Sequence, residues 1–216
     1  MAIDTQEFGS NPAIQEKEAP KPLHFRQEVA VKDLPYIFEG DIPVKPADFE
    51  WSVSVPNWED QKSAAEEMMK KGEIAPGFDH WLESHKLGNG RVGVLEINNL
   101  DTPDHVPAIR VDMIQTETAH LPEKFGYNNA EGVGSFLLDN LCALADLNGW
   151  RIYLNPVDKG GKLTQGPLYS WYKRRGFDDP YKFPKGSDYD GDMQRWPKQP
   201  DISQPIISIV ESGKAK

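Results

Sequence analysis

The most regular pattern in the chain lies between two glycines, Gly132 and Gly149. Apolar side chains recur there at the three- and four-residue spacing of one helix face: Leu137, Leu138, Leu141, Leu144 and Ala145. Such a stripe predicts a helix that packs on a core. Gly149 fits the end of this helix, because glycine readily takes the left-handed conformation that closes helices.

Two stretches before this helix are patterned as strands. Residues 91–97 are apolar on both faces, which is typical of a central strand. Residues 108–115 alternate, with Ile109, Val111 and Met113 on one face. A turn-rich connection joins the two stretches, so we expect them to form an antiparallel hairpin.

Residues 150–155 alternate in the same way directly after the helix. A strand, a helix and a second strand in this order favour two parallel neighbours joined by the helix. We therefore expect 108–115 and 150–155 to lie side by side, parallel and splayed.

The remaining elements are predicted from shorter patterns. A helix is expected to begin after Asn57, which is a good N-cap, and to end near Gly72. The others are helices over 78–85 and 167–175 and closing strands over 192–196 and 206–210.

The N-terminal part of the chain looks different from the rest. Residues 1–22 are polar, charged and proline-bearing, and Pro35, Pro43 and Pro46 interrupt the apolar pieces that follow. We therefore predict an extended arm over 1–48, with at most one edge strand, and a single domain over 49–216. The arm is also a candidate segment for binding a protein partner.

Composition excludes some classes of function. The chain has 216 residues and a formal net charge of −10, and its pI is about 5.0. This acidity argues against binding to nucleic acid and to anionic membranes. The chain shows no signal-peptide pattern and no apolar segment of membrane-spanning length, so we expect a cytoplasmic protein. The sequence leaves the oligomeric state open.

Two motifs connect these elements to a known family. Asn129-x-x-Gly132-x-Gly134 precedes the long helix, and Tyr172-x-x-x-Gly176-Phe177 ends the following one. In this order the chain resembles the GCN5-related N-acetyltransferase superfamily. The resemblance implies an α/β (α+β) fold of the acyl-CoA N-acyltransferase type, with a mixed, mainly antiparallel sheet flanked by helices. It also implies transfer of an acetyl group from acetyl-CoA to an amine of a small molecule or a protein.

The glycines suit a phosphate site on their own physical grounds. Gly132 and Gly134 lack a Cβ, and the free N–H groups of a helix start attract phosphate. From the resemblance, the acetyl-CoA site comprises Ile114, Gln115, Asn129, Gly132, Val133, Gly134 and Ser135. Glu131 opposes this use, because a carboxylate 4 Å from a phosphate costs about 1 kcal/mol in water. Lys124 is a candidate to compensate.

The chemistry of acetyl transfer requires a base for the ammonium group and allows an acid for the leaving thiolate. The family pattern implies Tyr172 as the acid, with Tyr169 as a second candidate. Glu117 is the preferred base and His120 the alternative. The alternative function is a non-catalytic relative that serves as a structural or protein-interaction module.

No metal site is expected. The five histidines show no metal-ligand spacing. The acidic run Asp188–Asp192 lacks the order of a calcium loop and is predicted to be a solvated turn.

Overall fold

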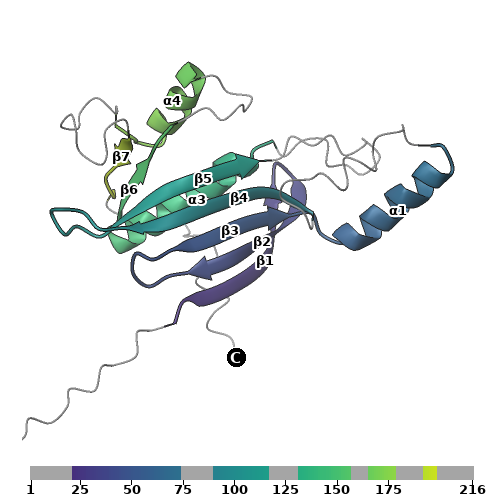
Figure 1. The fold of residues 1–216 in the computed structure, drawn as a ribbon, viewed down its shortest axis with the longest axis horizontal. Coiled ribbons are helices and arrows are strands. Elements are labelled where there is room, and N and C mark those ends of the chain that lie inside the picture. The colour runs from purple at the N-terminus through teal and green to yellow at the C-terminus, as the bar shows by residue number, and fades with distance from the viewer. Residues whose placement is uncertain (1–20, 74–89, 117–130, 157–164, 179–191, 199–216) are drawn as a thin grey trace, which may run out of the picture.

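The computed structural model describes residues 21–73, 90–116, 131–156, 165–178 and 192–198. Within these residues the fold is mixed α/β, with one sheet of seven strands in the spatial order β1 to β7. Neighbouring strands are antiparallel except for β5 and β6, which are parallel (Figure 1). The elements are β1 (Leu23–Val31), β2 (Leu34–Ile42), β3 (Phe49–Ser54), α1 (Trp58–Lys70), β4 (Arg91–Leu100), β5 (Ala108–Thr116), α3 (Val133–Asn148), β6 (Arg151–Leu154), α4 (Gln165–Lys173) and β7 (Met193–Arg195).

The prediction of an extended arm over 1–48 is wrong for the stretch that the structure describes. Strands β1 and β2 form a hairpin and continue the sheet through β3. Lys32 and Asp33 make its two-residue turn, with φ of 50° and 67°, which is the backbone sign that tight hairpins require. The prolines do not prevent this pairing, because Pro35 lies beside the turn and Pro43 follows the last residue of β2. Residues 1–20 lie outside the described part.

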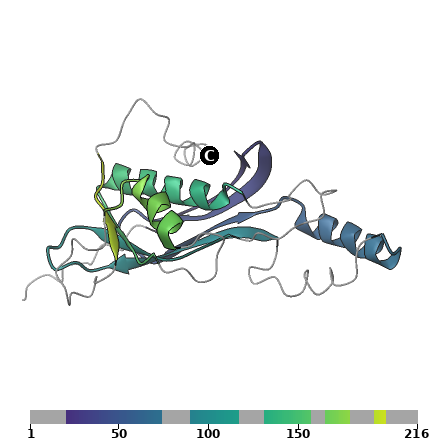
Figure 2. The same ribbon diagram turned by 90° about the horizontal axis from the view of Figure 1, so that it is seen from above.

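The core lies between the sheet and α3. Figure 2 shows α3 and α4 on the same side of the sheet. The apolar stripe of α3 is buried against side chains from the central strands, as its spacing predicts. Gly132 and Gly149 flank the helix with φ of 90° and 70°, so both ends use the left-handed conformation that glycine allows.

Helix α1 projects from one end of the sheet (Figure 1). It begins one residue after Asn57, close to the predicted start. The helix predicted over 78–85 and the strand predicted over 206–210 lie outside the described residues. The strand predicted over 192–196 is present as β7.

Strands β4 and β5 form the predicted antiparallel hairpin, but with an irregularity. Ile97 pairs with Val111 and Glu96 with Met113, so Asp112 is an extra residue in β5. Such a bulge moves the following side chains to the opposite face. Ile114 therefore packs against the core, where simple alternation predicted Met113.

A search of the described residues for membrane-spanning segments gives a negative result. None of these helices combines the length and the apolar character that crossing a bilayer requires.

Candidate functional site

Strands β5 and β6 are paired over only part of their length. Their parallel register runs from Ala108 with Arg151 to Val111 with Leu154, and there it ends. Strand β5 continues to Thr116, and the bulge at Asp112 lies at this very point. A bulge bends its strand and increases the local twist. Strand β6 itself ends at Leu154, at the level of this bulge, so the splay of the two strands stays a prediction.

The start of α3 packs directly on the end of the β4–β5 hairpin. A Cβ added to Gly93 of β4 would lie 2.3 Å from Cγ1 of Val133, so only glycine lets the helix approach this closely. A Cβ added to Gly134 would lie 3.2 Å from Cγ2 of Thr116. Thr116 pairs with Gly93 across the hairpin. The last residues of β5 and the first turn of α3 therefore meet.

The first turn of α3 has backbone N–H groups without an intrahelical acceptor. The first intrahelical bond runs from the N–H of Phe136 to the carbonyl of Gly132, at 2.8 Å. Val133, Gly134 and Ser135 therefore have no intrahelical acceptor for their N–H groups. Gly132 supplies no side-chain cap, and this turn contains no acidic residue. Partial positive charge gathers at such a helix end.

A lysine from the β1–β2 turn lies over the same place. The Cγ, Cδ and Cε atoms of Lys32 would each be 3.4 Å from a Cβ on Gly132. Its Nζ donates a hydrogen bond to Oε1 of Glu131, and the two side chains form an ion pair. Glu131 therefore does not face the helix start as an unopposed negative charge.

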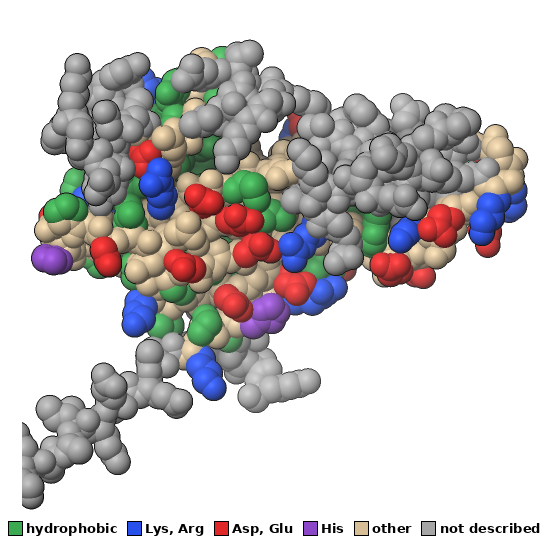
Figure 3. All heavy atoms as spheres, in the orientation of Figure 1, with side chains coloured by type: hydrophobic (Ala, Val, Ile, Leu, Met, Phe, Trp, Pro, Cys, Tyr) green, Lys and Arg blue, Asp and Glu red, His purple; other side chains and the backbone are tan. Residues whose placement is uncertain are grey.

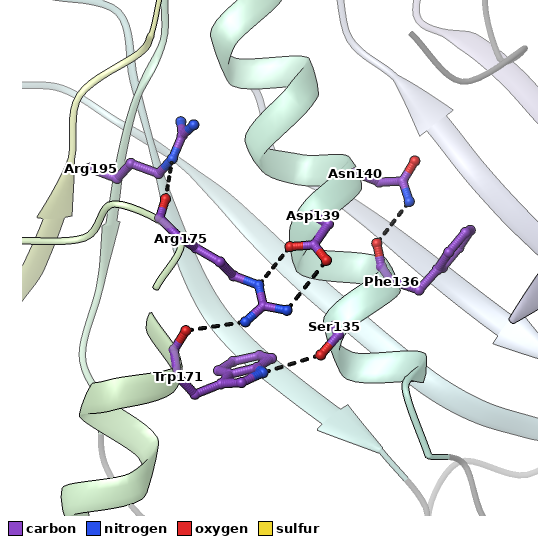
Figure 4. Close-up of polar contacts among 7 residues, drawn as sticks. All are labelled: Ser135, Phe136, Asp139, Asn140, Trp171, Arg175 and Arg195. Atoms are coloured by element: carbon purple, nitrogen blue, oxygen red, sulfur yellow. Dashed lines mark hydrogen bonds and ion pairs between the residues drawn. The ribbon is translucent and has the colours of Figure 1, made fainter. Parts of the chain in front are cut away.

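Hydrogen bonds from α4 and from Arg175, just after its last residue, connect this segment to the first turns of α3 (Figure 4). Nε1 of Trp171 donates to Oγ of Ser135 at 3.2 Å. Arg175 binds Asp139 through two nitrogens, at 2.6 and 3.3 Å, and its guanidinium carbon lies 4.5 Å from the centroid of the Trp171 ring. Arg195 of β7 donates to the carbonyl of Arg175 at 2.9 Å. The helix start is thus held from two sides, by β4 and by α4.

Tyr172 lies in the core. Its side chain is 4% exposed, and its ring makes edge contacts with Trp171 and Phe177. Burial raises the pKa of Tyr172 to about 12, and the charge of Arg175 opposes this rise. The phenol therefore keeps its proton at neutral pH. Tyr169, the second candidate, is half-buried and packs against the same core.

The other predicted site residues divide into two groups. The structure brings the end of β5, which carries Ile114 and Gln115, close to the segment 132–135. Asn129 and Glu117 lie outside the described residues, as do the alternatives His120 and Lys124, so their roles stay predictions.

Two charged residues of this region, Lys32 and Asp192, are not among the site residues that the sequence predicts. Lys32 was placed in the arm, although the alternation on both sides of Lys32-Asp33 is the pattern of a hairpin. Asp192 was assigned to a solvated turn, but it is 1% exposed. It begins the predicted strand 192–196, and this position was the available signal that its side chain points into the structure.

Asp192 contacts Arg110 of β5. Nη2 of Arg110 donates to Oδ1 at 3.3 Å and lies 3.2 Å from Oδ2. Burial raises the pKa of Asp192, while the charge of Arg110 and a side-chain hydrogen bond with Asn155 lower it. Burial has the largest effect, so the carboxyl group titrates at a higher pH than an ordinary aspartate.

The sheet face opposite α3 is rich in acidic side chains (Figure 3). The pairing register and the buried set of the core assign to this face Glu39, Glu50 and Glu96. Glu50 lies directly opposite Glu96 in the register, and Arg91 binds Glu50 at 3.0 Å. Within the described residues, no group of side chains has the composition of a metal site.

Comparisons of the chain with protein-family models, with curated proteins and with solved structures give no significant match. The proposals below rest on the residues and their geometry.

Proposed function

We propose that the chain is an acetyl-CoA-dependent N-acetyltransferase of the GCN5-related type, acting on an amine of a small molecule or a protein. One observation carries the proposal. The parallel pairing of β5 with β6 ends at Val111, level with a bulge in β5, and the last residues of β5 meet a glycine-bounded helix start. A strand edge followed by an anion site suits an extended amide chain that ends in a diphosphate.

The edge of β5 suits the pantetheine arm. Beyond Val111, β6 no longer pairs with β5, so no strand of the described part of the chain lies against that edge of β5. An extended ligand with amide groups binds such an edge as an added strand does. Ile114 and Gln115 lie in this segment, which agrees with their predicted role.

The start of α3 suits the diphosphate. The N–H groups of Val133, Gly134 and Ser135 have no intrahelical acceptor, and a helix start favours an anion by about 0.3–1 kcal/mol, or up to about 2 kcal/mol when partly buried. Lys32 adds a full positive charge beside Gly132. A bound diphosphate would compete with Glu131 for this lysine, so Glu131 weakens binding without preventing it.

The chemistry needs few groups from the protein. Acetyl-CoA supplies the acyl group as a thioester, and the protein has to position it, deprotonate the amine and protonate the thiolate. Tyr172 stays the acid that the family pattern implies, and burial keeps its phenol protonated at neutral pH. Glu117 stays the predicted base from the sequence. The acidic sheet face attracts a cationic acceptor.

A non-catalytic role is the second candidate, and one observation favours it. The ring of Tyr172 is packed between Trp171 and Phe177, as a purely structural tyrosine would be. In that case the glycines at 132 and 134 serve only the close packing of α3 on β4 and β5.

Ligand-induced thermal stabilisation separates the two candidates. A ligand that binds only the native state must raise the melting temperature. We expect acetyl-CoA and free CoA to raise it, and pantetheine and ADP, which each carry one half of the ligand, to raise it less. A folded chain whose melting temperature none of the four changes would favour the non-catalytic role.

A glycine pair supplies the matched variants. Gly134→Val places a branched side chain against Thr116 and the ligand path, so stabilisation by acetyl-CoA should disappear. A Cβ added to Gly166 in α4 meets no atom within 4 Å, so Gly166→Ala should leave the stabilisation by acetyl-CoA unchanged. Circular dichroism establishes that both variants are folded before ligand is added.

A further inference from the structure

Asp192 lies next to the point where the pairing of β5 with β6 ends. Val111 pairs with Leu154 in the last parallel pair, and Leu154 pairs with Met193 of β7. Asp192 precedes Met193, so it is next to the end of this pairing. Its contact with Arg110 puts its side chain on the sheet face opposite α3, because Ile109 and Val111 point to the core.

The carboxylate of Asp192 is incompletely bonded. Its Oδ2 atom is buried and accepts no hydrogen bond, although Arg110 lies 3.2 Å away. Nε2 of Gln194, two residues along the same strand face, is also buried and has no partner. Nε of Arg151 on this face is buried without a partner as well. Buried polar atoms in native proteins nearly always have partners, so three exceptions on one face require an explanation.

A structural aspartate in the same protein looks different. Asp146 of α3 binds Arg195 through both oxygens, and its Oδ1 also accepts from the backbone N–H of Lys198 at 2.6 Å. Both oxygens of this carboxylate are therefore used. By contrast, Oδ2 of Asp192 is buried without a hydrogen-bond partner, next to the end of the β5–β6 pairing.

We propose that Asp192, in place of Glu117, is the general base that takes the proton from the acceptor's ammonium group, with Gln194 as the neighbouring donor to an oxygen of the same acceptor. This inference rests on the proposed acetyl transfer. The ammonium gives one proton to Oδ2. The neutral amine then attacks the thioester carbonyl, a C–N bond forms, and the C–S bond breaks. The nitrogen then gives up its second proton, the thiolate takes up one proton and leaves as CoA thiol, and Asp192 passes the first proton on to water.

The surroundings of Asp192 suit this role. Desolvation moves its pKa upward from the usual 3.8, and a base works best when its pKa approaches the working pH. Arg110 from β5 is the charged group in contact with it. Tyr153 of β6 lies between Arg110 and Gln194 in the register, and its hydroxyl accepts a hydrogen bond from Arg151 at 2.9 Å.

The test compares Asp192→Asn with Asp146→Asn, which loses a partly buried aspartate–arginine pair on the other side of the sheet. Calorimetry measures acetyl-CoA binding, and thiol release measures transfer to a panel of primary amines: spermidine, lysine amide, glycinamide and ethanolamine. We expect both variants to bind acetyl-CoA like the wild type. Asp192→Asn should lower kcat by about 100-fold or more, and Asp146→Asn should change it little.

A pH profile separates a base from a structural carboxylate. The kcat/KM of the wild type should rise with pH as Asp192 loses its proton. Arg110→Met removes the charge that lowers this pKa, so the rise should move to higher pH with the same amine. In Asp192→Asn, this rise of kcat/KM with pH should be absent.

The outcomes are distinguishable. If the wild type binds no acetyl-CoA, the proposed function fails, and the role of Asp192 fails with it. If it binds acetyl-CoA, then equal rates in Asp192→Asn and the wild type overturn the base alone. An unmoved profile in Arg110→Met, or a wild type that releases thiol with none of the amines, also overturns it.

Discussion

Lys32 and Glu131 form an ion pair although 99 positions separate them in the chain. Both side chains are more than half exposed, so the pair adds little to stability, about 0–1 kcal/mol. Its significance lies in its position. It joins the β1–β2 turn to the start of α3 and places a cation at the proposed phosphate site.

This link predicts that the N-terminal hairpin is part of the domain. Removing residues 1–42 deletes Phe25, Tyr36 and Phe38 from the core, and losing a buried aromatic typically costs about 3–5 kcal/mol for each residue. Thermal unfolding should show no cooperative transition for this variant. Removing residues 1–20 should leave the midpoint nearly unchanged. A shortened chain without the hairpin that melts like the full one would contradict the role of β1 and β2.

Gly93 should tolerate no side chain. An added Cβ would lie 2.3 Å from Val133 and 3.2 Å from Leu137, and overpacking of this kind costs about 1–3 kcal/mol. Gly93→Ala should lower the free energy of unfolding by that amount in urea titrations. Gly166→Ala, with open space around it, is the control. Equal stability of the Gly93 variant and the wild type would show that α3 does not seat on β4 as described.

Cys142 is predicted to be unreactive in the native protein. Burial raises the pKa of its thiol from 9.0 to about 11, and the thiolate is the reactive form. At pH 8 the native thiol should react with a disulfide reagent at least about 100-fold more slowly than in denaturant, because a rise of about two pKa units lowers the thiolate fraction about 100-fold. The native rate should keep rising up to about pH 11. Equal native and denatured rates, or a plateau near pH 9, would place the thiol in solvent.

Local patterns predicted much of the central fold. The stripe on α3, its two glycine ends and the strands around it gave the parallel neighbours β5 and β6 and the antiparallel β4–β5 hairpin. These elements are long or strongly periodic, so short-range rules suffice for them.

The missed features depend on contacts between distant segments. The bulge at Asp112 leaves no local signal, because it depends on how β5 pairs with β4. Lys32 and Glu131 come together only through the hairpin and α3. Asp192 lies in an acidic run, and its burial follows from the pairing of β7 with β6. The prolines favour an extended arm over strands β1 and β2 in the sequence, because the effect of a proline on a strand depends on its position relative to the strand ends.

The central claim is that the start of α3, together with Lys32, binds the diphosphate of acetyl-CoA. Calorimetric titration of acetyl-CoA into the wild type, Lys32→Met and Glu131→Gln tests it most directly, with Lys45→Met as the control for loss of a surface lysine.

We predict measurable binding to the wild type and about tenfold weaker binding to Lys32→Met, which corresponds to about 1.4 kcal/mol. Glu131→Gln should bind several-fold more tightly, because Lys32 is then released to the phosphates, and Lys45→Met should match the wild type. No heat with any folded variant, or equal affinity of Lys32→Met and the wild type, would contradict the claim.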